Sequence, residues 1–287
     1  MNCYYYVHTG HRIGLDRFRR AATIIRLLDE DITLLTSDYR IASSAKEFGI
    51  KRSVGIDVVG AIPHIADIND KIIFDSDEIN EDSIEDMVSY FSKFLRVSDN
   101  LEESKHPKES LLNPYLKEDG VCNEIVVDDK YFNKYSKNIK ISFFFGDDDY
   151  EKVIEQNLEF FDGFNMDLLL GFYYFVGYED SLEKAFSNIY EYEDYDEVIC
   201  GSEILVTSSA QAVLESLASG CKPIYIQRDD AIKDFQKYFK ELNVPVIDGF
   251  NKEKLSSIIS NIDNIKYGKI EHNSNTLKTF LKSSLNL

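Results

Sequence analysis

Side chains suited to acid–base and anion chemistry gather in two parts of this 287-residue chain. The first part lies near the amino terminus, where His8 and His11 precede Arg17 and Arg20. Histidine has a reference pKa of about 6.5 and therefore suits a general base near neutral pH. Arginine keeps its charge and binds anions through two parallel N–H groups. The alternative is that both histidines are ordinary surface residues of a loop.

The second part is a strand, a turn of hydroxyl residues and a helix between residues 203 and 219. Thr207, Ser208 and Ser209 place hydroxyls and free backbone amides at the predicted start of the helix, which favours an anion there. Glu215 follows on the helix, where its carboxylate can accept hydrogen bonds from a ribose diol. The alternative is that Ser208 or Ser209 only caps the helix and that Glu215 is a solvated helix residue.

Strands and helices alternate along most of the sequence, which predicts βαβ units and mostly parallel sheets. Apolar runs predict strands that include residues 139–145 and 166–176, and helical spacing of apolar residues predicts a helix at 232–242. We expect an α/β protein with two Rossmann-like, doubly wound domains that face a cleft. We expect residues 1–100 to form the first domain, 101–137 an irregular connection, and 138–287 the second domain, and the sequence leaves open whether the last helix crosses back to the first domain.

Composition excludes several classes of protein. Hydrophobic residues make up 44% and charged residues 29%, a mixture that is inconsistent with a wholly disordered chain. The formal net charge of −19 disfavours binding to nucleic acid or to an anionic membrane surface. The sequence contains no run of about 18 apolar residues, so we expect no transmembrane segment. The amino terminus lacks the basic and apolar regions of a secretion signal, so we expect a cytoplasmic protein.

The four cysteines indicate neither a metal centre nor a disulfide framework. They form no C-x-x-C pair, and none has a histidine at ligand spacing: Cys3, Cys122, Cys200 and Cys221. We therefore expect no metal and no cofactor. The sequence leaves the oligomeric state open.

Residues 203–226 resemble the carboxyl-terminal nucleotide-binding motif of GT-B glycosyltransferases. Within that class they are most similar to the lipid-II-forming N-acetylglucosaminyltransferase group and to the UDP-sugar hydrolases of pseudaminic acid biosynthesis. Other matches occur in the same order. Residues 13–20 resemble the family motif I-G-x-G-H-x-x-R, residues 142–149 resemble the interdomain strand that ends in G-G-x-D, and residues 190–192 resemble the loop whose backbone reads the uracil.

This resemblance implies an enzyme of nucleotide-sugar metabolism. It would be a hydrolase or glycosyltransferase acting at the C1–diphosphate linkage of a UDP-sugar, in surface glycan or nonulosonic acid metabolism. The first domain would contact the sugar or acceptor, with Gly14 and Arg20 on the sugar. The second domain would bind the nucleotide through Gly146, Tyr192, Thr207, Ser208, Ser209, Ala210, Gln211 and Glu215.

One departure from the family pattern bears directly on catalysis. Arg17 stands where the family has its active-site histidine, and a guanidinium cannot act as a general base at neutral pH. His11 is our first choice as the replacement, because it lies closest to the turn at Gly14, and His8 is the second. The expected catalytic residues are therefore His11, His8 and Arg17.

A second departure concerns charge. Asp147 stands where the family has the second glycine of G-G-x-D, and two further carboxylates follow it. They would repel a diphosphate unless Mg²⁺ or an arginine intervened. The alternative is that they cap the next helix. The acidic turn at residues 75–78 could suggest a metal site. Carboxylate-rich turns after strands are more often solvated, so we expect a solvated turn here. The alternative function is a catalytically inactive relative that binds a sugar nucleotide or a protein partner.

Overall fold

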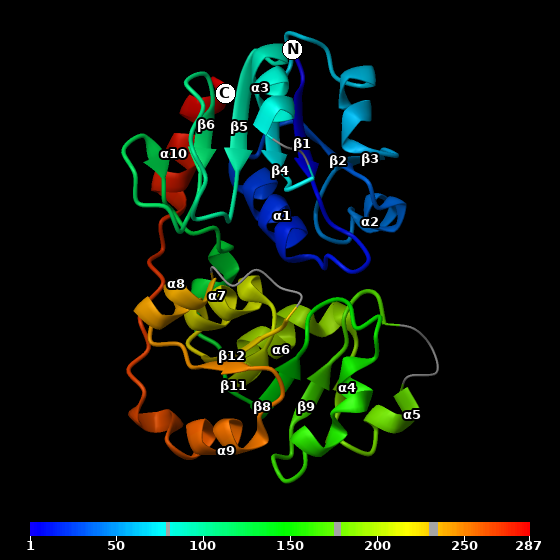
Figure 1. Ribbon diagram of the computed structural model, residues 1–287, viewed down its shortest axis with the longest axis vertical. Helices are drawn as coiled ribbons and strands as arrows, with labels where there is room; N and C mark the ends of the chain where they lie inside the picture. Colours follow the sequence, from blue (N-terminus) through cyan, green and yellow to red (C-terminus); the bar gives the residue numbers. More distant parts are fainter. Residues whose placement is uncertain (79–80, 175–178, 230–234) are drawn as a thin grey trace. The chain divides into compact units, whose positions relative to one another are not determined.

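A computed structural model describes residues 1–78, 81–174, 179–229 and 235–287. The chain divides into two compact units (Figure 1). Unit 1 comprises Met1–Val126 together with Asn273–Leu287, and unit 2 comprises Val127–His272. No helix of the described residues is long and apolar enough to cross a membrane.

Unit 1 is built on a parallel sheet of seven strands in the order β3-β2-β1-β4-β5-β6-β7. Parallel strands are covered on both faces and therefore read as continuous apolar runs, as in the tyrosine-rich first strand. The strands are β1 (Cys3–Val7), β2 (Ile32–Thr36), β3 (Arg52–Gly55), β4 (Lys71–Asp75), β5 (Lys93–Val97), β6 (Ser110–Leu112) and β7 (Val121–Cys122).

Helices cover both faces of this sheet. On one face, α1 contacts β1, α2 contacts β2, and α10 contacts β5. On the other face, apolar residues of η1 and α3 pack against Tyr4, Tyr6 and Phe74. The helices are α1 (Asp16–Leu28), α2 (Tyr39–Ser44), the 3₁₀ helix η1 (Val59–His64), α3 (Glu81–Tyr90) and α10 (Ser274–Leu285).

The carboxyl-terminal helix α10 belongs to unit 1. Leu277, Leu281 and Leu285 recur at helical spacing and are all buried. The Lys71 ammonium donates to the carbonyl of Asn286 at 2.9 Å, which fixes the end of the chain against β4. Residues 110–122 also extend the unit-1 sheet, so the structure divides the chain at 126 and 272 rather than at the boundaries expected from composition.

Unit 2 is built on a parallel sheet of six strands in the order β10-β9-β8-β11-β12-β13. The predicted strand at 166–176 is shorter, because β9 ends at Leu169, and residues 175–176 lie outside the described residues. The strands are β8 (Ile139–Phe144), β9 (Asp167–Leu169), β10 (Ile189–Tyr190), β11 (Ser202–Thr207), β12 (Lys222–Gln227) and β13 (Val246–Asp248).

The unit-2 sheet is also covered on both faces. Apolar residues of α4, η3, α9 and η5 form one core with strand residues such as Phe143 and Val206. Helices α6 and α7 contact β11 and contribute no residues to this core. The predicted helix at 232–242 is described only from Phe235. The helices are η2 (Asp129–Phe132), α4 (Val153–Gln156), η3 (Leu158–Phe160), α5 (Glu179–Leu182), η4 (Tyr192–Asp194), α6 (Tyr195–Gly201), α7 (Ala210–Ala218), α8 (Phe235–Glu241), α9 (Lys252–Ser260) and η5 (Ile262–Asn264).

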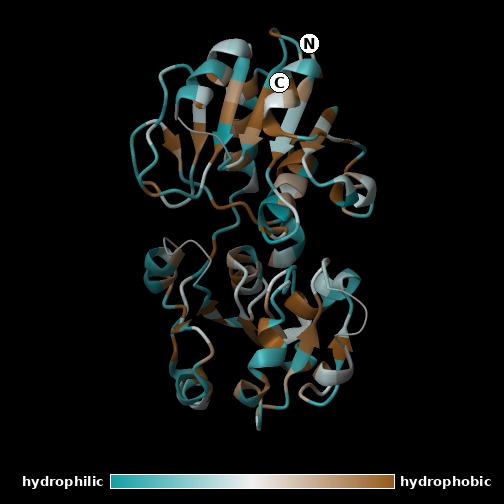
Figure 2. Ribbon diagram, turned by 45° about the vertical axis from the view of Figure 1, so that its right-hand side comes forward, coloured by the Kyte–Doolittle hydropathy of each residue, from teal (hydrophilic) through white to brown (hydrophobic). Residues whose placement is uncertain are grey.

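The predicted fold class, α/β with two doubly wound parallel sheets, is confirmed. Figure 2 shows that hydrophobic residues concentrate in the strands of both sheets, whereas the helices carry most of the hydrophilic colour. In such sheets, ligands bind beyond the carboxyl ends of the strands where the strand order reverses. That point lies between β1 and β4 in unit 1, and between β8 and β11 in unit 2.

We predict that the apolar face of α10 stabilises unit 1. Leu281→Ala removes a fully buried side chain and should lower the free energy of unfolding by about 2–5 kcal/mol. Thr279→Ala, at an exposed position of the same helix, should change it by less than about 0.5 kcal/mol. Urea denaturation followed by circular dichroism measures both. Equal losses in the two variants would show that this face is not the packed one.

Candidate functional site

A buried ion pair stands at the switch point of unit 1. Asp75, the last residue of β4, is 1% exposed. The Arg20 guanidinium of α1 donates to both of its oxygens, from Nε at 2.9 Å and from Nη2 at 2.6 Å. The Tyr5 hydroxyl donates to the same carboxylate at 3.0 Å. Burial raises the pKa of Asp75, and the charge of Arg20 opposes that rise.

The same arginine reaches a second strand end. Arg20 Nη1 donates to Asp99, which follows β5, at 2.5 Å. Burial disfavours the charged guanidinium, yet Asp75 and Asp99 together raise the pKa of Arg20 well above its ordinary value. Arg20 therefore stays charged and joins the carboxyl ends of β4 and β5 to α1.

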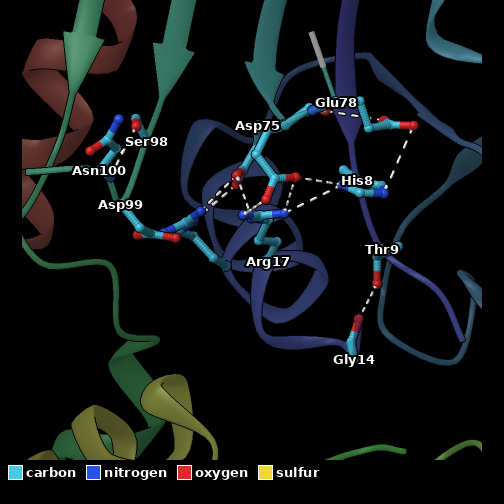
Figure 3. Close-up of polar contacts among 12 residues, drawn as sticks. His8, Thr9, Gly14, Arg17, Asp75, Glu78, Ser98, Asp99 and Asn100 are labelled. Atoms are coloured by element: carbon cyan, nitrogen blue, oxygen red, sulfur yellow. Dashed lines mark hydrogen bonds and ion pairs between the residues drawn. The ribbon is translucent and has the colours of Figure 1, made fainter. Parts of the chain in front are cut away.

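A second set of charges lies beside this pair (Figure 3). Arg17 donates to both oxygens of Asp77, at 2.8 and 2.9 Å. His8, the residue after β1, lies with Nδ1 2.6 Å from Asp77 and with Nε2 3.8 Å from Glu78. A carboxylate only accepts, so Nδ1 carries the proton, and Nε2 of a neutral ring is the basic nitrogen. The bonds from His8 and Arg17 hold the pKa of Asp77 well below its usual range.

We call His8, Arg17, Arg20, Asp75, Asp77 and Asp99 the arginine cluster. It brings together the predicted site residues His8, Arg17 and Arg20. Its arginines and carboxylates form ion pairs at the carboxyl edge of the sheet. The expectation that the turn at residues 75–78 is solvated is wrong for Asp75, which is buried because Arg20 and Tyr5 bind it. No group of His, Cys, Asp and Glu among the described residues is arranged to hold a metal ion.

The other two predicted residues of this loop lie apart from the cluster. His11 belongs to a turn in which the N–H of Gly14 donates to the carbonyl of Gly10 at 2.9 Å. Gly14 has a φ of +85°, which favours glycine, and its carbonyl accepts from the Thr9 hydroxyl at 2.6 Å. His11 lines a separate open cavity of about 360 Å³ together with Tyr39 and Arg40.

At the switch point of unit 2, helix α7 begins in a cluster of hydroxyls. Ser209 caps the helix, because its Oγ accepts from the N–H of Ala212 at 3.0 Å. The Thr207 hydroxyl accepts from the N–H of Ser209 at 3.0 Å. The Ser208 Oγ differs from both: it is buried and has no hydrogen-bond partner within the part of the chain that the structure describes. A buried hydroxyl at a helix N-terminus is placed to donate a hydrogen bond to a bound anion or water.

Glu215 lies inside unit 2 rather than on a solvated helix face, so the solvated alternative is wrong. It is 1% exposed, with one oxygen accepting from Tyr195 at 2.7 Å and the other from Gln211 at 2.9 Å. Burial raises the pKa of the neighbouring Tyr131 well above its ordinary value, and the charge of Glu215 adds to this. The two donors fix the carboxylate at the side of α7 that faces α6.

The loop after β8 passes close to the loop after β9. Gly146 has a φ of +122°, a backbone conformation that favours glycine. A Cβ at Gly171 would lie only 2.4 Å from the Cα of Asp147, so the two backbones touch. Asp149 accepts from the N–H groups of Val153 and Ile154, at 2.7 and 3.0 Å, and so caps the start of α4. This is the alternative that the sequence left open for the acidic run.

Arg228, which the sequence did not single out, lies at the same sheet edge as the predicted nucleotide-binding residues. It follows β12, packs 4.5 Å above the centre of the Phe145 ring, and donates to the carbonyl of Asp148 at 3.3 Å. A cation therefore stands beside the acidic run at the same sheet edge. Its signal in the sequence was an arginine directly after a buried strand. Tyr192 begins η4. Its ring packs in a T-shaped arrangement with the ring of Phe172, with the two ring centres 4.9 Å apart.

No protein-family model and no curated protein matches the chain. Solved structures do match it. The UDP-GlcNAc 2-epimerase of Methanocaldococcus jannaschii, in complex with UDP-GlcNAc and UDP, is 13% identical, with a TM-score of 0.60 and 99% of each chain covered. The UDP-GlcNAc 2-epimerase of Neisseria meningitidis, bound to UDP-GlcNAc, is 10% identical, with a TM-score of 0.57 over 99% of this chain and 100% of that chain. HepE of Anabaena, in complex with UDP, is 9% identical, with a TM-score of 0.55 over 100% of this chain and 94% of that one. The chain has the GT-B-like fold of these proteins.

We predict a pH-dependent stability contribution from Asp77. Its folded pKa lies below the ordinary value of 3.8, so its contribution is present above that pH and is lost as the pH falls toward the folded pKa. Asp77→Asn should therefore be less stable than the wild type at neutral pH, and the difference should shrink as the pH drops below 3.8. Urea denaturation across a pH series measures this difference. Asp119→Asn, an exposed carboxylate of the same unit, is the control. A difference that stays constant with pH would rule out the ion pairing.

Proposed function

We propose that the chain binds a nucleotide-sugar, most simply a UDP-sugar, at the switch point of unit 2 and acts at its C1–diphosphate linkage. The observation that carries the proposal is the buried, unsatisfied hydroxyl of Ser208 at the start of α7. A diphosphate oxygen would complete its hydrogen bonding, and the positive end of the α7 helix dipole would favour the same charge. Arg228 supplies a cation that offsets the acidic run at residues 147–149.

Other observations support the nucleotide as the ligand. Solved proteins of the same fold hold UDP or UDP-GlcNAc. The loop at Tyr192, which would read the base, begins η4 directly before α6. Glu215 would hold the ribose diol by exchanging one of its two present donors, Tyr195 or Gln211. The resemblance to UDP-sugar hydrolases and N-acetylglucosaminyltransferases favours surface glycan or nonulosonic acid metabolism as the setting.

Ser208→Ala separates ligand binding from folding. Because the wild-type hydroxyl has no partner among the described residues, its removal should leave the free energy of unfolding unchanged or slightly raised. Loss of a hydrogen bond to a charged phosphate should weaken UDP binding by about 1.5–3 kcal/mol, or roughly 10–150-fold in Kd. Calorimetric titration with UDP measures the affinity.

Ser216→Ala is the matched control, since the Ser216 hydroxyl donates to the carbonyl of Val213 farther along the same helix. It should lower stability and leave UDP affinity unchanged, the reverse of the Ser208 pattern. Unchanged UDP affinity in Ser208→Ala would contradict the proposal that the diphosphate binds at the start of α7.

For the chemistry, the geometry favours His8 over His11 as the base. Asp77 orients the His8 ring through Nδ1 and leaves Nε2 to take a proton, which is how a carboxylate commonly positions a catalytic imidazole. His11 lies in the separate turn at Gly10–Gly14. Arg17 would contact a sugar or phosphate oxygen only by releasing Asp77, which now binds both ends of its guanidinium.

We predict that His8→Ala lowers the turnover of UDP-sugar about 10²–10⁴-fold with little change in UDP affinity, because a general base acts only in the transition state. His11→Ala should stay near the wild-type rate. Release of UDP by a coupled assay, with sugar products identified by NMR, distinguishes hydrolysis, transfer and epimerisation. Retention of full activity in His8→Ala would overturn the assignment of the base.

A second candidate function is a catalytically inactive, ligand-binding relative. It is favoured by one observation: the position of the family histidine is Arg17, and that residue is bound to Asp77. Tight UDP binding that is sensitive to Ser208→Ala, without turnover of any UDP-sugar tested, would support this candidate over the enzyme.

A further inference from the structure

Strand β3 forms one edge of the unit-1 sheet, as Figure 1 shows, and β2 pairs with its inner side. The N–H of Ile56, just beyond the strand, donates to the carbonyl of Thr36 in β2 at 2.9 Å. Successive residues of a strand point their backbone groups to opposite sides. The N–H and C=O groups of Ser53 and Gly55 therefore point away from β2, toward the open side of the edge. Such a row of groups is a template for another strand.

The side chains on this edge have a charge pattern that is complementary to itself. Lys51 precedes the strand and Asp57 follows it, and both are exposed. Neither has an ion-pair partner among the residues that the structure describes. Lys51 directly precedes the strand and Asp57 lies two residues beyond its end, so extension of the strand by pairing would place both side chains on the same face as Ser53 and Gly55. Val54 lies midway between them and is 37% exposed.

Antiparallel pairing with an identical strand fits this pattern in only one register. When the two-fold axis passes Val54, Ser53 lies opposite Gly55 of the second copy, so the outward backbone groups bond to one another. The same register places Lys51 opposite Asp57 of the second copy, twice by symmetry. With the axis at Ser53, Lys51 would face Gly55. With the axis at Gly55, it would face Val59.

Exposed apolar side chains accompany the edge. Ten large hydrophobic side chains are exposed among the described residues, and five of them fall between residues 39 and 68. One is Tyr39, whose ring packs against Gly55 and whose hydroxyl donates to Asp57 at 2.8 Å. A Cβ at Gly55 would lie 2.5 Å from this ring, so the ring lies directly over the strand at Gly55. Pairing of the edge would therefore bury apolar as well as backbone surface.

We propose that β3 pairs antiparallel with β3 of a second copy of this chain, about a two-fold axis at Val54, with Lys51 bound to Asp57 across the interface. The two sheets then continue into one another. The net charge of −19 opposes any association of two copies at long range, so local complementarity must supply the attraction. This inference is independent of the nucleotide site.

The test is the oligomeric state of the full chain at physiological ionic strength, measured by sedimentation equilibrium. The wild type should be a dimer at high protein concentration. Lys51→Asp places a carboxylate opposite Asp57 of the second copy, and Asp57→Lys places two ammonium groups opposite each other. Each should weaken dimerisation about tenfold or more, because the repulsive pair occurs twice.

The double variant Lys51→Asp/Asp57→Lys restores opposite charges and should recover the dimer. Lys269→Asp, an exposed position in unit 2, makes the same change of net charge as Lys51→Asp and should leave dimerisation unchanged. Circular dichroism establishes that each variant is folded. A monomeric wild type at the highest soluble concentration, or a double variant that stays as weak as the single variants, would overturn the proposal. A dimer insensitive to both single variants would place the interface elsewhere.

Discussion

The buried ion pair between Asp75 and Arg20 determines the arrangement of the carboxyl edge of unit 1. A carboxylate and a guanidinium taken out of water each cost several kcal/mol, and only a well-aligned partner offsets that cost. Arg20 offsets the cost for Asp75 with two hydrogen bonds, from Nε and Nη2. Its third nitrogen, Nη1, donates to Asp99. Helix α1 is thereby fixed against the ends of β4 and β5. Arg17 stands three residues earlier on the same helix face, so the anchored Arg20 also places Arg17 beside Asp77.

The two switch points solve the problem of buried charge differently. In unit 1, cations and carboxylates pair with one another, and little binding capacity is left for a further anion. In unit 2, the buried Glu215 is satisfied by the neutral donors Tyr195 and Gln211, and Arg228 stands beside the acidic run at the sheet edge. The contrast is consistent with the proposal that a diphosphate binds at the start of α7 in unit 2.

The α/β class was predictable because it rests on local signals: apolar strands, helical spacing and polar residues after strand ends. The domain limits were not, because β6 and β7 have three and two residues and show no period. The role of α10 was open for a related reason, since its amphipathic face does not reveal which sheet it covers. Only the fold brings Lys71 to Asn286.

The candidate site was predictable as a set of segments but not as a set of contacts. Hydroxyls before α7 and histidines after β1 stood out from type and spacing. Asp77, the partner of His8, lies 69 residues farther along the chain. Tyr195, which donates a hydrogen bond to Glu215, lies 20 residues before it. No periodicity links such pairs. The choice between His8 and His11 therefore had to wait for the position of Asp77, which orients only one of them.

The return of α10 to unit 1 makes that unit discontinuous along the chain, with all of unit 2 inserted between its parts. Synthesis runs from the amino terminus, so the seven strands of unit 1 and all of unit 2 are made before α10. The surface of β5 therefore stays uncovered while unit 2 is made, and unit 1 can complete its fold only after α10 has been added. Cleavage of the chain near residue 272 would detach that helix from its own polypeptide, although its sheet lies in the amino-terminal fragment.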